Sequence, residues 1–151
     1  MKKLLAPLAA LVLLLSGCSS TSSTFQLPLS PVPYTMAVDS KIVTHLQVTI
    51  PSNDFAKEAK QAGADSQVLI YYQPASGKKV IFMSVYSFPA QTFDSLKKAD
   101  QPPAFGQEVI RRNGTVLSVA GPSDSIFDPK SADGKNVAAL YATIYKASTY
   151  T

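Results

Sequence analysis

The chain has 151 residues, with 14 lysines and arginines against 10 aspartates and glutamates. Two of these lysines, Lys2 and Lys3, stand at the N-terminus, and the remaining 12 basic residues nearly balance the acidic ones. This balance argues against the clustered positive charge of a nucleic-acid-binding face. The single cysteine and single histidine exclude an internal disulfide, a thiolate metal site and a metal site built on several imidazoles. We therefore expect no nucleic-acid partner and no cofactor.

The first 17 residues have the layout of a cleaved secretory signal. Lys2 and Lys3 precede an apolar run from Leu4 to Leu15, and small residues come after it. The run is too short for a transmembrane helix, which needs about 20 apolar residues. Leu15-Ser16-Gly17-Cys18 resembles the lipobox of bacterial lipoproteins, and the resemblance covers residues 1–18. The alternative is an ordinary secretory signal with an incidental cysteine.

The lipobox resemblance implies a lipid anchor on Cys18. In that family the cysteine sulfur is diacylglycerylated, the signal is cut before the cysteine, and the new N-terminus is usually acylated, with palmitate as a typical chain. Two or three acyl chains hold a protein almost permanently, because each buried methylene contributes about 0.8 kcal/mol. Ser19, in place of a retaining aspartate, implies the outer membrane with the domain in the periplasm, or the outer face of the cell membrane in an organism without one.

Residues 18–33 differ in composition from the remainder of the chain. Serines and threonines occupy positions 19–24, and three prolines stand at positions 28, 31 and 33. This composition predicts a lipidated tether with a reach of roughly 50 Å. In the alternative, the proline segment docks on the domain through Phe25, Leu27 and Leu29. Residues 34–151 are then long enough for one self-sufficient domain.

Strand patterns dominate the predicted domain. Residues 42–50 alternate between apolar and polar positions and predict one strand, with His45 in its middle. Residues 68–73 and 79–88 predict two strands joined by a turn, the second apolar on both sides and therefore central in a sheet. Asn113-Gly114 predicts a type I′ turn between strands 108–112 and 115–119, in which Ile110 faces Leu117.

Three segments have helical patterns. The first runs from Ser52 or Asn53 to Ala62, with Gly63 as its stop, and the second covers residues 92–99. Residues 136–147 carry apolar side chains at helical spacing, although a strand remains possible there. The pattern predicts a single α+β domain, an antiparallel sheet of about five or six strands with two or three helices packed against it. This layout is similar to the small sheet-and-helix envelope domains of the PsbP and Mog1 group.

Two clusters of side chains are candidates for chemistry. His45 with Asp39 is the candidate general-base pair, although a strand histidine without a marked partner is usually structural. Asp124, Asp128 and Asp133 share a loop that could offer oxygen ligands to calcium, but helix capping and turns are the favoured interpretation.

The sequence supports two functions from different classes. The first is a non-enzymatic binding or accessory module for an envelope protein or glycan, with ligand contacts from Tyr71, Tyr86, Arg111 and Arg112. Core packing is nevertheless the expected role of most tyrosines. The alternative is a small envelope hydrolase that acts on peptidoglycan or another glycan. The sequence assigns no catalytic residue and leaves enzymatic activity open.

Overall fold

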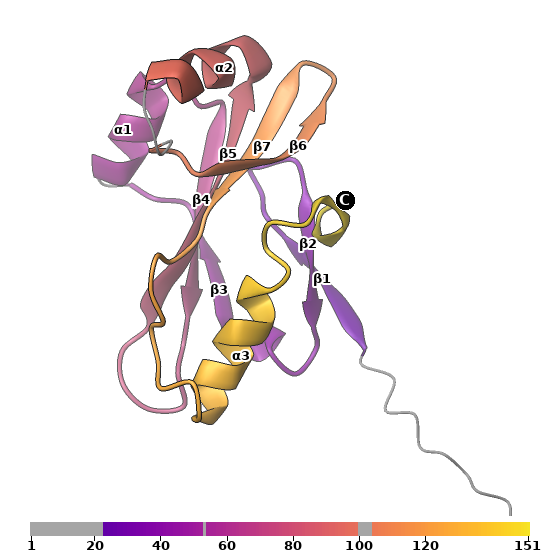
Figure 1. The fold of residues 1–151 in the computed structure, drawn as a ribbon, viewed down its shortest axis with the longest axis vertical. Helices are drawn as coiled ribbons and strands as arrows, with labels where there is room; N and C mark the ends of the chain where they lie inside the picture. The colour runs from indigo at the N-terminus through magenta and orange to yellow at the C-terminus, as the bar shows by residue number, and fades with distance from the viewer. Residues whose placement is uncertain (1–22, 53, 100–103) are drawn as a thin grey trace, which may run out of the picture.

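The computed structural model describes residues 23–52, 54–99 and 104–151, and these form one α+β domain with two antiparallel sheets (Figure 1). Cys18 and the predicted signal lie outside the described residues. The larger sheet has five strands, in the spatial order β3 (Leu46–Thr49), β4 (Ser66–Tyr72), β5 (Val80–Pro89), β7 (Thr115–Ala120) and β6 (Gln107–Arg112). The smaller sheet pairs β1 (Thr24–Pro28) with β2 (Thr35–Asp39). The predicted fold class is confirmed.

Three helices pack against the large sheet: α1 (Asp54–Gln61), α2 (Ala90–Ala99) and α3 (Ala132–Tyr141). Figure 1 shows α1 and α2 at one end of the sheet and α3 towards the other. Gly63 has a φ of +88° and stands just after α1, as predicted for a helix stop. The C-terminal segment, for which the sequence left helix and strand open, forms the helix α3. Ser131 caps this helix by accepting a hydrogen bond from the Gly134 amide at 2.9 Å. This helix covers residues 132–141 and not the predicted 136–147.

The hairpin of β6 and β7 has the predicted register. Ile110 pairs with Leu117, and Asn113 and Gly114 both have positive φ, at 51° and 76°. A type I′ turn needs this backbone conformation at both central positions. The central position of β5 is also confirmed, since it lies between β4 and β7.

The predicted strand over residues 42–50 is wrong at its start. Val43–His45 form a 3-10 turn (η1), and only Leu46–Thr49 pair with β4. The turn begins because the Ile42 amide donates to the Asp39 carbonyl and the His45 amide donates to the Ile42 carbonyl, both at 2.9 Å. Ile42 is buried, but it precedes this turn and does not belong to a strand.

The prediction of a tether through residue 33 is wrong from Thr24 onward. Residues 24–28 form β1, and Leu29 and Val32 are 0% and 1% exposed. The proline segment folds back because the Leu29 amide donates to the Tyr34 carbonyl at 3.0 Å, so β1 and β2 can pair. The alternative of docking through this segment is correct, although Phe25 stays 46% exposed.

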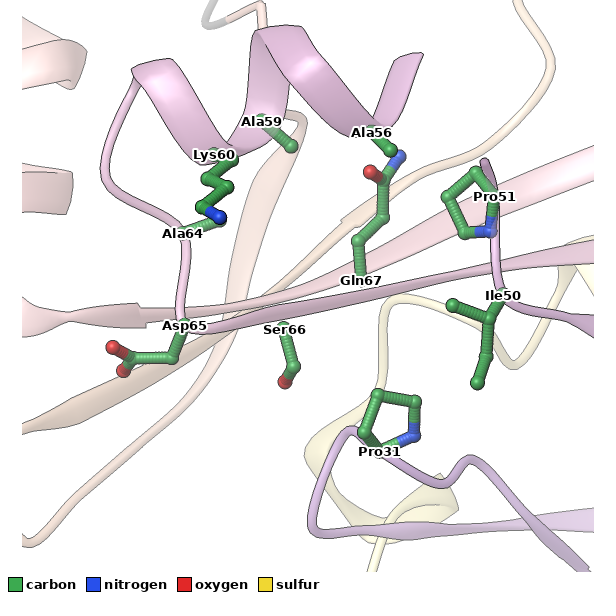
Figure 2. A pocket seen from close by; sticks show the side chains of 10 residues that line it. All are labelled: Pro31, Ile50, Pro51, Ala56, Ala59, Lys60, Ala64, Asp65, Ser66 and Gln67. Carbon is green, nitrogen blue, oxygen red and sulfur yellow. The ribbon is translucent and has the colours of Figure 1, made fainter. Parts of the chain in front are cut away.

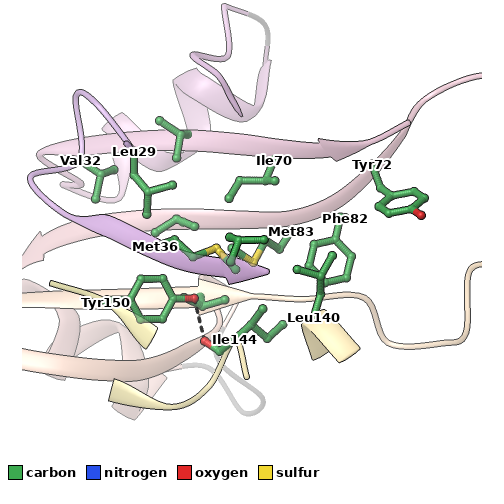
Figure 3. Close-up of a cluster of buried hydrophobic side chains, with 14 of the residues drawn as sticks. Leu29, Val32, Met36, Ile70, Tyr72, Phe82, Met83, Leu140, Ile144 and Tyr150 are labelled. Atoms are coloured by element: carbon green, nitrogen blue, oxygen red, sulfur yellow. Dashed lines mark hydrogen bonds between the residues drawn. The ribbon is translucent and has the colours of Figure 1, made fainter. Parts of the chain in front are cut away.

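The two faces of the large sheet bury two separate apolar clusters. The larger cluster lies between the sheet, the β1–β2 ribbon and α3, and includes Leu29, Met36, Ile70, Phe82 and Ile144 (Figure 3). The smaller cluster contains Ala59, Tyr86, Phe88, Phe93 and Val116 and packs against α1 and α2. Neighbouring residues on a strand point to opposite faces, so Val85 belongs to the first cluster and Tyr86 to the second.

Candidate functional site

The four predicted ligand contacts do not form one site. Tyr71 lies opposite Ile81 near the start of β5, whereas Arg112 lies opposite Thr115, which is opposite Pro89 at the end of β5. Eight residue steps of β5 separate these positions, or about 26 Å of strand. The predicted grouping of Tyr71 with Arg111 and Arg112 is therefore wrong.

Tyr86 is a core residue. Its side chain is 6% exposed and packs edge-on against Phe105, with ring centroids 5.4 Å apart. Burial raises the pKa of the Tyr86 hydroxyl, with the Ser84 and Gln67 side chains acting in the opposite direction. The prediction of Tyr86 as a ligand contact is wrong, because its ring is buried in the smaller apolar cluster.

Arg111 is engaged by two carboxylates. Its guanidinium donates to both oxygens of Glu108, at 2.9 and 2.7 Å, and to both oxygens of Asp94, at 2.7 and 3.2 Å. Arg111 thereby lowers the pKa of Glu108 and of Asp94. The pairing ties α2 to β6 and uses the donors that an anionic ligand would need.

The remaining predicted contacts are exposed or half-buried. Arg112 is exposed beside the hairpin turn. The Lys79 ammonium lies 4.6 Å from the centre of the Tyr71 ring, within the range of a cation–π contact.

His45 belongs to a structural network around Tyr72. Its Nδ1 lies 2.9 Å from the Gln73 carbonyl oxygen, and its ring stacks on Tyr72 with centroids 5.3 Å apart. The Tyr72 hydroxyl donates to Asp133 at 2.9 Å and accepts from the Asn136 side chain at 3.1 Å. These contacts hold the imidazole in place against Tyr72 and the Gln73 carbonyl.

The predicted carboxylate loop serves turns and a helix cap. Asp128 accepts a hydrogen bond from the Lys130 amide at 2.9 Å, and Asp133 lies in the first turn of α3. Asp133 also accepts the Ala75 amide, at 3.3 Å, and so ties the β4–β5 turn to α3. Within the described ranges, no three histidine, cysteine or acidic side chains gather as a metal site would require.

The sequence did not indicate the pocket beneath α1. It has a volume of about 330 Å³ and lies between α1, the start of β4 and the loop after β1 (Figure 2). Its lining residues are Pro31, Ile50, Pro51, Ala56, Ala59, Lys60, Ala64, Asp65, Ser66 and Gln67. Two pocket-lining residues of α1 are alanines, and such short side chains leave space between the helix and the sheet.

Gln67 is the distinctive residue of this pocket. Its side chain is 7% exposed and rises from β4 towards α1 (Figure 2). Neither the amide nitrogen nor the amide oxygen makes a hydrogen bond of standard geometry. Gln67 pairs with Tyr86 across β4 and β5, and its side chain acts to lower the pKa of the Tyr86 hydroxyl. Buried amides normally have hydrogen-bond partners of good geometry, so this amide has hydrogen-bonding capacity beyond its weak interaction with Tyr86.

The end of β3 explains why the pocket is open. β3 pairs with residues 69–72 of β4, and Pro51 lies just beyond its last residue. Among the described residues, no strand pairs with Ser66, Gln67 or Val68 on the β3 side. A short length of sheet edge therefore borders the pocket.

The rim of the pocket is apolar. Ile50 is 62% exposed and lines the opening together with Pro31 and Pro51. Phe55, next in sequence to the lining residue Ala56, is 47% exposed. Lys60 and Asp65, also in the lining, have opposite charges that balance each other. One sequence signal was available for this site: glutamine directly before the apolar run of β4.

A second pocket, of about 480 Å³, lies between the 122–129 loop and α3. Tyr141 contributes an exposed ring, and Val137 and Ala138 form much of the α3 wall. In the part of the chain that the structure describes, none of its lining side chains is a buried polar group lacking a hydrogen bond. The pocket beneath α1 is therefore the stronger candidate site.

Comparison with known proteins gives no family for this chain: no family model, no curated protein and no solved structure matches it. Within the described residues, no helix is both long enough and apolar enough to cross a membrane.

Proposed function

We propose that this protein is a lipid-anchored binding module of the cell envelope, non-enzymatic and held at the outer membrane by acyl chains on Cys18. The observation that carries the proposal is the order Leu15-Ser16-Gly17-Cys18 behind a charged and then apolar N-terminus. Ser19 supports the outer membrane as its location. The partner is an envelope protein or glycan.

The position of β1 changes the expected geometry of the anchor. Five residues, Ser19 to Ser23, separate Cys18 from the first residue of β1. Even a fully extended chain of this length places Thr24 within about 20 Å of Cys18. The domain would therefore be held close to the membrane surface. Anchoring at this distance raises the effective concentration of the domain towards envelope partners, so a weak binding site can suffice.

A binding role agrees better with the described side chains than hydrolysis does. The single histidine contacts a backbone carbonyl and an aromatic ring, and Asp39 accepts a hydrogen bond from the Lys41 amide at 2.8 Å. The pocket beneath α1 instead offers an amide with unused hydrogen-bond capacity and an apolar rim. These are features of recognition rather than of proton transfer.

Cys18→Ala tests the anchor. We expect the variant to lose palmitate labelling and either to appear in the soluble fraction or to accumulate as uncleaved precursor. Ser19→Asp is the matched control: it should keep the label and move to the inner membrane in an enterobacterial host. A Cys18→Ala protein that is still labelled and still membrane-bound would contradict the proposal.

A further inference from the structure

We propose that the pocket beneath α1 is a peptide-recognition site, which takes an extended segment of an envelope protein with a bulky apolar side chain. The inference rests on the proposed function, because it supplies the partner class and the contact surface of the binding module. Three observations carry it: the buried Gln67 amide, the open sheet edge beside it, and the apolar rim.

The Gln67 side chain matches the chemistry of a peptide group. A primary amide has an acceptor oxygen and a donor nitrogen side by side, and a peptide bond offers the complementary donor and acceptor. Gln67 is only 7% exposed, and its side chain points towards α1 across the pocket (Figure 2). Both amide atoms are buried, and a peptide group that reached them would satisfy them without displacing a hydrogen bond of standard geometry.

The sheet edge favours an extended ligand. β4 continues past the end of β3, so residues 66–68 have no strand partner on that side within the described chain. Extended peptides bind such edges by adding main-chain hydrogen bonds to the sheet, while pockets receive alternate side chains. Gln67 lies in the middle of this unpaired stretch and could align the added segment.

The rim and the charges argue for an apolar peptide rather than an anionic ligand. Ile50 presents a large apolar surface at the opening, with Pro31 and Pro51 also in the lining. Lys60 and Asp65 cancel in charge, so the pocket has no excess of positive charge for a phosphate or a polyanionic glycan. An apolar side chain placed against Ile50 would bury surface that is now in water.

The pocket also lies away from the predicted membrane attachment. β1 runs from Thr24, the end nearer Cys18, to the loop that carries Pro31, and Pro31 lines the pocket. Five strand residues correspond to about 16 Å. The pocket therefore lies beyond the end of β1 that is farther from Cys18 in sequence, and this position leaves room for a protein partner in the proposed arrangement.

Site-specific photo-crosslinking of the full-length protein in its native envelope tests the inference. Benzoylphenylalanine replaces Ile50, which lines the opening, or Phe55, the neighbour of the lining residue Ala56. At two control positions of similar exposure, 41% and 46%, it replaces Ile81 or Phe25. We expect protein adducts at positions 50 and 55 and at neither control. Mass spectrometry of the adducts should map them to a segment of the partner with a bulky apolar residue.

Gln67→Leu links the adducts to the buried amide. It should reduce adduct yield at positions 50 and 55 at least about fivefold, because the hydrogen bonds to the bound peptide group are lost. Ile50→Ser, at an exposed position, should weaken the adduct at position 55 even if Gln67→Leu does not fold. Unchanged adducts in a folded Gln67→Leu protein would overturn the site.

The other outcomes separate this inference from the proposed function. Protein adducts at Ile81 or Phe25 alone would leave a binding module and overturn the pocket as its site. Lipid or glycan adducts at positions 50 and 55 would overturn the peptide ligand. An absence of adducts at all four positions would overturn the pocket, whereas the fate of the anchor would still be decided separately by palmitate labelling of Cys18→Ala.

Discussion

Tyr72 and Gln67 are two buried polar residues of the same strand with opposite hydrogen-bonding states. Tyr72 is 0% exposed, and its hydroxyl donates to Asp133 and accepts from Asn136. Gln67 is 7% exposed, and its amide makes no hydrogen bond of standard geometry. The Tyr72 hydroxyl ties β4 to α3 through hydrogen bonds within the chain, whereas the Gln67 amide is the group that a ligand of the proposed site would contact.

The difference arises from the surroundings of each face of β4. Tyr72 points into the larger cluster, where the first turns of α3 bring Asp133 and Asn136 to its hydroxyl. Gln67 points to the other face, where α1 lines the pocket with Ala56, Ala59 and Lys60. Alanine offers no side-chain donor or acceptor, and the amide makes no hydrogen bond of standard geometry.

The largest effect on stability should come from breaking the hydrogen bonds of the Tyr72 hydroxyl with Asp133 and Asn136. Tyr72→Phe removes the hydroxyl, leaves the ring in place, and takes a donor away from the Asp133 carboxylate. We expect a loss of about 1–3 kcal/mol in the free energy of unfolding, measured by urea denaturation. Lys130→Ala, at an exposed position in the same loop region, is the control and should change stability little. A Tyr72→Phe protein as stable as wild type would mean that the network does not fix α3.

Gln67→Leu should have a smaller effect of the opposite sign. The substitution replaces two buried polar atoms that lack hydrogen bonds with apolar groups of similar size, so the free protein should gain about 1 kcal/mol. The same urea experiment measures this gain. A loss of stability instead would show that Gln67 has a structural partner, with the Tyr86 hydroxyl as the first to examine.

The sequence predicted well those elements whose signals are local. Asn113-Gly114 determines its own turn, because both residues tolerate positive φ and the turn then sets the register of β6 against β7. The central position of β5 was also predicted correctly from its apolar character on both faces. In these cases no distant residue was needed to make the prediction.

The errors occurred where distant contacts decide the structure. Residues 24–33 have the composition of a tether, yet Leu29 is buried in the same cluster as Met36 and Tyr150. Arg111 looks like a free cation in the sequence, but Asp94 approaches it from α2. The pocket beneath α1 depends on where β3 ends and on short side chains in α1, and neither feature marks a site until the chain is folded.

The smallest effect concerns a third arrangement, in which polar groups have hydrogen-bond partners but are partly exposed to solvent. Arg111→Met should destabilise the protein only slightly at neutral pH, because the side chains of the ion pairs with Asp94 and Glu108 are 25–48% exposed. Arg111 lowers the pKa of both carboxyls in the folded state. Their contribution is therefore present above the ordinary carboxyl pKa of about 4 and is lost as the pH falls through the lowered folded values.

Urea midpoints of wild type and Arg111→Met should consequently differ at pH 7 and converge as the pH falls below the carboxyl range. High salt at pH 7 should also reduce the difference, since mobile ions screen exposed pairs. Arg112→Met, at the neighbouring exposed position, is the matched control and should show a smaller dependence on pH. If the difference for Arg111→Met persists undiminished at pH 2–3 and in high salt, packing of the arginine stem rather than its charge stabilises the contact between α2 and β6.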